Sequence, residues 1–74
     1  MGGYQLTAII EQEGNLFVAR CVELDITSQG GSEAAALSNL KGDVLMFLEH
    51  SEEAEILERL ARHVAVTLFE VDLR

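Results

Sequence analysis

The sequence contains a single cysteine, Cys21, and neither proline nor tryptophan. One cysteine excludes an intramolecular disulfide, so we expect the chain to work in a reducing compartment, the cytoplasm. Linker-like stretches, low-complexity tracts and internal repeats are also missing. Because 74 residues is below the usual size of one domain, we expect residues 1–74 to form a single domain.

Positive charge is scarce: five basic residues stand against thirteen acidic ones, which gives a net charge of −8. Such a chain repels nucleic-acid phosphates and anionic membrane surfaces and favours a basic partner. The longest apolar run, residues 44–48, is far too short to span a bilayer. The first residues lack the basic region and apolar core of a signal peptide. We therefore expect neither direct nucleic-acid binding nor membrane binding.

Apolar residues, in contrast, make up 49% of the chain, which is typical of a folded protein. A core in a domain this small rarely contributes more than ~3 to 5 kcal/mol, and no disulfide or metal cluster supplements it. We therefore expect self-association, as a homodimer or a higher homo-oligomer.

Alternating apolar residues predict strands in the first half of the chain. Residues 4–11 place Tyr4, Leu6, Ala8 and Ile10 on one face. The polar residues 12–15 predict a four-residue hairpin loop, after which residues 16–21 form the second strand. A third strand is expected over residues 26–29, ended by Gly30 and Gly31.

Helical patterns follow. Ser32 is a suitable N-cap for a helix over residues 33–49. Its apolar stripe comprises Leu37, Leu40, Val44, Phe47 and Leu48. Ser51 is expected to cap a second helical segment, which carries the i,i+4 pairs Glu55 with Arg59 and Glu58 with Arg62.

The β-branched residues of 63–73 predict a last strand that returns to the sheet, parallel to a neighbour. Both of its faces are apolar, which predicts a helix over one and another subunit over the other. The fold is thus expected to be α+β, with the order β-β-β-α-α-β.

No pattern indicates catalysis. The pairs Glu11 with Glu13 and Glu23 with Asp25 are expected from the abundance of acids and are interpreted as a solvated edge. His50 and His63 lack the spacing of a helical zinc site. Cys21 is interpreted as a buried structural thiol. We expect no catalytic residue, no metal and no cofactor.

One residue breaks a local rule, because a glycine inside a helix costs ~1 kcal/mol relative to alanine. Gly42 is interpreted either as a tolerated defect or as a point of close approach by another element, including a second subunit.

Residues 17–49 carry a recognisable combination of residues. An aromatic, a small residue, a cysteine and a leucine are followed by Gln-Gly and by a helix with Ala, Leu, Asn and Leu. These positions are Phe17, Ala19, Cys21, Leu24, Gln29, Gly30, Ala36, Leu37, Asn39 and Leu40. Tyr4, Glu11 and the stretch 67–71 match the first and last strands. The chain resembles the short stand-alone members of the HicB family of antitoxins.

The resemblance implies a partly reduced ribonuclease H-like fold that neutralises a small basic ribonuclease toxin of the HicA type by covering its active surface. Longer members append a DNA-binding module, which we do not expect here because residues 1–74 are predicted to form one domain, so operator binding is not implied. The family's proline-containing bend is replaced by residues 22–25, and its usual threonine before the helix by Ser32. No catalytic residue is implied for the antitoxin.

Charge alone suggests the partner-binding residues, which are Glu23, Asp25, Glu52, Glu53 and Glu55. Two alternatives remain open. The chain is an orphan of the same fold that serves as an oligomeric scaffold or binds another protein, or it is a metal-dependent nuclease. The dispersal of its acids over turns and helices argues against the nuclease.

Overall fold

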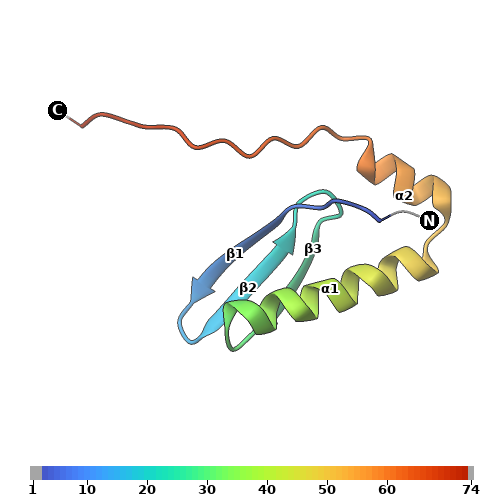
Figure 1. The fold of residues 1–74 in the computed structure, drawn as a ribbon, viewed down its shortest axis with the longest axis horizontal. Coiled ribbons are helices and arrows are strands. Elements are labelled where there is room, and N and C mark those ends of the chain that lie inside the picture. Colours follow the sequence, from blue (N-terminus) through green and yellow to red (C-terminus); the bar gives the residue numbers. More distant parts are fainter. Residues whose placement is uncertain (1–2, 74) are drawn as a thin grey trace.

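The computed structural model describes residues 3–73. Three strands, β1 (Ala8–Glu13), β2 (Leu16–Cys21) and β3 (Ile26–Gly30), form an antiparallel sheet in the order β1-β2-β3. Two helices follow, α1 (Glu33–His50) and α2 (Glu53–Leu60). Helix α1 lies against one face of the sheet, mainly over β3 and β2 (Figure 1). The expected α+β class is confirmed.

The hairpin between β1 and β2 is tighter than expected. Glu13 pairs directly with Leu16, so the loop has two residues and not the four of the 12–15 prediction. Gly14 reaches φ 62° at the first loop position, as in a type II′ turn, whose twist matches the flanking strands. Glycine adopts this conformation without steric cost, so the polar residues before it can remain in β1.

Strand β1 also begins later than expected, at Ala8 and not at Tyr4. The Val22 N–H donates to the Thr7 carbonyl at 3.0 Å, which continues the ladder for one further bond. The Thr7 N–H then donates to the Glu23 carboxylate at 2.8 Å and not to a backbone carbonyl of β2. This side-chain acceptor ends the ladder.

The expected α1 cap and apolar stripe are confirmed. The Ser32 hydroxyl accepts a hydrogen bond from the Ala35 N–H at 3.1 Å. Leu40 and Val44 are buried, and the other stripe residues pack against the core around them. Gly30 permits the start of α1 to lie close to β3, because a Cβ atom there would meet the Ala36 nitrogen and lie 2.7 Å from the Ala35 carbonyl carbon.

Two expectations for α2 are wrong. Ser51 does not cap it, because its N–H ends α1 by donating to the Phe47 carbonyl at 3.0 Å, and Glu52 occupies the N-cap without a side-chain bond. Arg62 does not pair with Glu58, because α2 ends at Leu60 and Arg62 binds backbone carbonyls instead. The Glu55–Arg59 pair is confirmed, with 3.5 Å between charged atoms.

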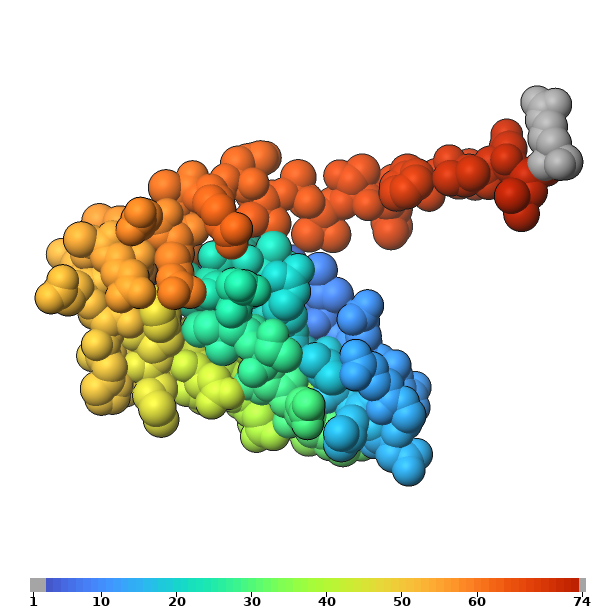
Figure 2. All heavy atoms as spheres, turned by 180° about the vertical axis from the view of Figure 1, so that it is seen from behind, coloured from blue at the N-terminus to red at the C-terminus, as the bar shows by residue number. Residues whose placement is uncertain are grey.

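The last strand expected over residues 63–73 is not formed. Residues 61–73 contain no helix or strand, and the segment extends away from the rest of the molecule (Figures 1 and 2). The radius of gyration is therefore 14.6 Å, whereas a compact domain of this length would have about 11 Å. An extended segment with β propensity becomes a strand only when a partner supplies hydrogen bonds.

The core is small. Its buried apolar residues are Ala19, Cys21, Leu24, Ala36, Leu40, Val44 and Ile56. The expected burial of Cys21 is thereby confirmed, and Leu24 and Cys21 are the largest side chains that are almost fully enclosed. No helix in the described part of the chain is both long and apolar enough to cross a membrane.

Two glycines are expected to respond oppositely to alanine. A Cβ at Gly42 meets nothing within 4 Å, so Gly42→Ala should raise the free energy of unfolding by up to about 1 kcal/mol. Gly30→Ala should lower it by about 1 to 3 kcal/mol, because the added methyl collides with the α1 backbone. Thermal and urea unfolding of both variants measures this, and a destabilised Gly42→Ala would show instead that another element approaches there.

Candidate partner-binding site

The turn between β2 and β3, residues 22–25, organises one end of the molecule. The Asp25 N–H donates to the Cys21 carbonyl at 2.8 Å, and Asp25 has φ 57°. A short polar side chain tolerates this left-handed conformation better than most residues do. The turn thereby buries Leu24 completely, while carbonyl oxygens of the turn face α2.

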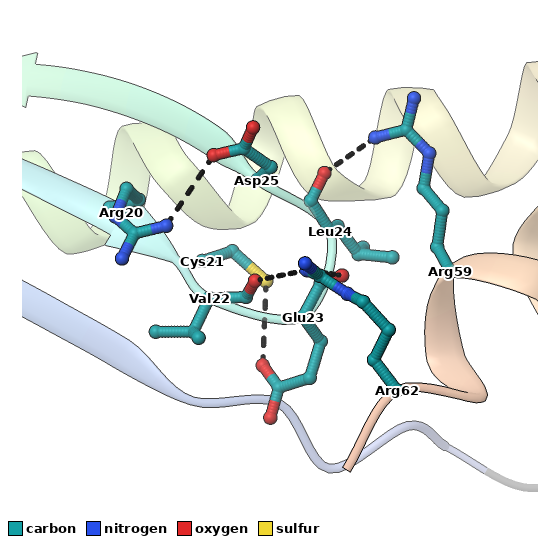
Figure 3. A network of polar contacts seen from close by, with 8 residues as sticks. All are labelled: Arg20, Cys21, Val22, Glu23, Leu24, Asp25, Arg59 and Arg62. Atoms are coloured by element: carbon teal, nitrogen blue, oxygen red, sulfur yellow. Dashed lines mark hydrogen bonds and ion pairs between the residues drawn. The ribbon is translucent and has the colours of Figure 1, made fainter. Parts of the chain in front are cut away.

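Two arginines hold α2 and the residues after it against this turn (Figure 3). The Arg59 guanidinium donates to the Leu24 carbonyl at 2.6 Å. Arg62 donates to the carbonyls of Val22 and Glu23 at 3.0 and 3.1 Å. Hydrogen bonds to a charged group are stronger than neutral ones, and two arginines satisfy three carbonyls here.

Glu23 is tied to the segment before β1. Its two carboxylate oxygens accept from the Thr7 N–H and hydroxyl, each at 2.8 Å, and the Cys21 thiol lies 3.9 Å away. Partial burial by itself would raise the pKa of Glu23, but these donors favour the charged form and lower the pKa below its ordinary 4.5. Glu23 therefore supplies negative charge at neutral pH from a fixed, half-buried position.

Asp25 is more accessible. Its carboxylate lies 3.4 Å from the Arg20 guanidinium, and 73% of the Asp25 side chain is exposed. A surface pair of this kind contributes little to stability because water screens it. Asp25 can therefore exchange its contact with Arg20 for a contact with a partner.

The five residues suggested by charge form two groups. Glu23 and Asp25 border a hollow of about 350 Å³ at the turn, together with Leu24, Glu58, Arg59 and Arg62. Glu52 and Glu53 lie exposed at the opposite end of α2, and Glu55 is paired with Arg59. Sequence reasoning missed Glu58 at the hollow because it assigned this carboxylate to Arg62.

A second surface, also missed, is an open groove of about 320 Å³ between the β1 side of the sheet and α1. Its lining is mostly apolar and consists of Tyr4, Leu6, Thr7, Ala8, Cys21, Leu37, Leu40, Lys41, Val44, Leu45 and Leu48. Leu45 is 56% exposed there. Leu45 lies outside the predicted apolar stripe of α1. This was the signal in the sequence that the apolar surface of α1 is wider than the area that the sheet covers.

Residues 3–73 contain no group of three His, Cys, Asp or Glu side chains placed to hold a metal ion. Comparison of the chain with models of protein families, with curated proteins and with solved structures gives no match.

Removal of the Arg59 guanidinium should destabilise the fold. Arg59→Met keeps most of the apolar stem but leaves the Leu24 carbonyl without its donor, which should cost about 1 to 3 kcal/mol. Glu55→Gln is the control, because it removes only the exposed ion pair and should cost about 0.5 kcal/mol or less. Equal losses in urea unfolding would show that the ion pair, and not the carbonyl contact, holds α2.

Acid should weaken the Glu23 contacts. Because the pKa of Glu23 is lower in the folded state, its contribution to stability is full above about 4.5 and is lost as the pH falls through the folded pKa. Glu23→Gln should therefore lose less stability than the wild type between about pH 6 and pH 3. Thr7→Val lacks only the hydroxyl donor, so its loss of stability over this pH range should lie between the losses of Glu23→Gln and the wild type. Parallel pH profiles for all three proteins would contradict the assignment.

Proposed function

We propose that this chain is an antitoxin-like protein-binding module of the cytoplasm that neutralises a small basic ribonuclease of the HicA type. The observation that carries the proposal is the placement of charge. The guanidinium groups of Arg59 and Arg62 are directed at backbone carbonyls of the turn. The carboxylates of Glu52 and Glu53 are exposed to solvent. With thirteen acidic residues against five basic ones, the exposed charge of the molecule is mainly negative.

This distribution favours a basic partner in two ways. An excess of exposed carboxylates attracts a positively charged protein from a distance and increases its rate of association. Glu23 adds negative charge that its Thr7 contacts hold in place, and Asp25 adds an accessible carboxylate. We place the partner over the turn and α2, where the acids suggested by the sequence lie.

The resemblance of residues 17–49 to HicB antitoxins supports the same class of partner. A three-stranded sheet followed by a helix is compatible with that resemblance. We assign the chain no catalytic residue, metal or cofactor, and we place its activity in binding.

One observation favours the second candidate, an orphan oligomeric scaffold of the same fold. The segment of residues 64–73 exposes several large apolar side chains that nothing in the described chain covers. Exposed apolar side chains in such number mark an interaction surface. An orphan scaffold would use this surface without binding a toxin.

Binding to a small basic protein from a neighbouring reading frame tests the proposal. Association should slow steeply as salt rises, and the double variant Glu52→Lys, Glu53→Lys should slow it at least about tenfold further at low salt. The matched control is Glu11→Lys, Glu13→Lys, which makes the same charge change near the hairpin tip, at the other end of the sheet from the turn. Kinetics by surface plasmon resonance measure both.

An effect confined to the α2 variant supports the proposed interface. Equal effects of the two variants, or association that is indifferent to salt, would contradict it. A self-associated chain that does not bind a neighbouring basic protein would favour the orphan scaffold.

A further inference from the structure

We propose that residues 64–73 of one copy add as a fourth strand to the free edge of β1 in a second copy, which returns the same contact. This exchange does not depend on the proposed toxin. It would cover two surfaces that are open in the described chain, because the exposed segment of one copy would fill the groove beside β1 of the other.

The residues of the segment alternate in character, so that as a strand it would have two different faces. One face carries Ala65, Thr67, Phe69, Val71 and Leu73, and the other carries Val64, Val66, Leu68, Glu70 and Asp72. Phe69 is 83% exposed and Leu68 is 97% exposed. The first face contains no charged residue, so it is suited to burial, while the second ends in two acids suited to water.

The edge of β1 is available to receive it. Thr7 pairs with Val22 through its backbone carbonyl, so the odd-numbered residues of β1 bond to β2. By the alternation of an antiparallel ladder, Ala8, Ile10 and Gln12 then direct their N–H and C=O groups outward. Such a row of unpaired groups is a template for another strand.

The opposite edge of the sheet is partly covered by α1. The Asn39 side chain of α1 donates to the Gln29 carbonyl of β3 at 2.7 Å. Gly30 brings the start of α1 close against β3 as well. Helix α1 contacts β1 much less than it contacts β3. The helix thus leaves the β1 side of the fold open.

The groove lies where side chains of the added strand would point. It runs between α1 and the start of β1 with the residues just before that strand, and its lining is mostly apolar. A strand beside β1 would direct the uncharged face of the segment, with Phe69 and Val71, toward Leu37 and Leu45 of α1. Glu70 and Asp72 would then lie on the open face of the sheet.

Charge indicates the direction of the added strand. Glu11 and Glu13 lie on the open face at the C-terminal end of β1. Like charges opposite each other in neighbouring strands are destabilising. An antiparallel strand places Glu70 and Asp72 at the other end of β1, beside residues 4–7, whereas a parallel strand brings them near Glu11 and Glu13. The exchanged strand is therefore antiparallel to β1.

A second copy, and not the same chain, is the partner because of where the segment begins. Arg62 is fixed on the turn, and Val64 borders a hollow with Arg20 and Val22 on the open face of the sheet. Figure 1 shows the segment leaving on the side of the sheet opposite α1. The groove is on the α1 side. Each chain carries one segment and one groove, so two copies satisfy both in a closed pair.

Four single variants of the full chain test this exchange by analytical ultracentrifugation. The wild type should sediment at about twice the 8.1 kDa of one chain. Phe69→Glu on the segment and Leu45→Glu in the groove should each weaken dimerisation at least tenfold. Leu68→Glu and Met46→Glu are matched controls, because they alter neighbours of similar exposure that do not face the groove, and they should remain dimeric. All four side chains are exposed in the single copy, so the fold of each variant should persist in circular dichroism.

A wild type that remains at 8.1 kDa up to ~100 μM would overturn the proposal. A dimer that resists both Phe69→Glu and Leu45→Glu, or one that all four variants dissociate equally, would also overturn it. Sedimentation of the chain alone does not measure binding of the basic partner. A failure of the strand exchange can therefore be distinguished from a failure of the toxin proposal.

Discussion

The hydrogen bonds from Arg59 and Arg62 to the carbonyls of the β2–β3 turn are the contacts on which the rest of the molecule depends. The core beneath them is small, and Leu24 is among its few fully buried side chains. The two arginines hold α2 on the turn, and Leu60 at the end of α2 packs against that core. They also set the point and the direction from which the last residues leave the domain.

Two properties of the surface follow from this anchoring. The two guanidinium groups are held at fixed positions on the turn, beside the carboxylates of Glu23, Asp25 and Glu58 that border the same hollow. The segment after Arg62 departs on the open face of the sheet, so the groove between β1 and α1 stays unfilled by its own chain. The recognition by charge and the strand exchange that we propose would thus use different surfaces of one small domain.

Local patterns predicted α1 with its N-cap and its apolar face. The stripe centred on Leu40 and Val44 and the cap at Ser32 depend on neighbours a few residues away, and both are confirmed. Contacts between distant residues were not predictable in this way. The bond from Thr7 to Glu23 and the docking of Arg62 join residues 16 and about 40 positions apart. The groove was missed for the same reason, because it exists only where α1 lies off the centre of the sheet. The β propensity of residues 63–73 indicates a strand but not whose edge it joins.

Hydrogen–deuterium exchange of the full chain at several concentrations tests the central claim most directly. If the segment joins the edge of another copy, amides of residues 64–73 and the outward amides of Ala8, Ile10 and Gln12 gain protection together as the concentration rises, and lose it together on dilution. Hydrogen exchange of these amides that is fast at every protein concentration, or slow at every protein concentration, would contradict the proposed strand exchange.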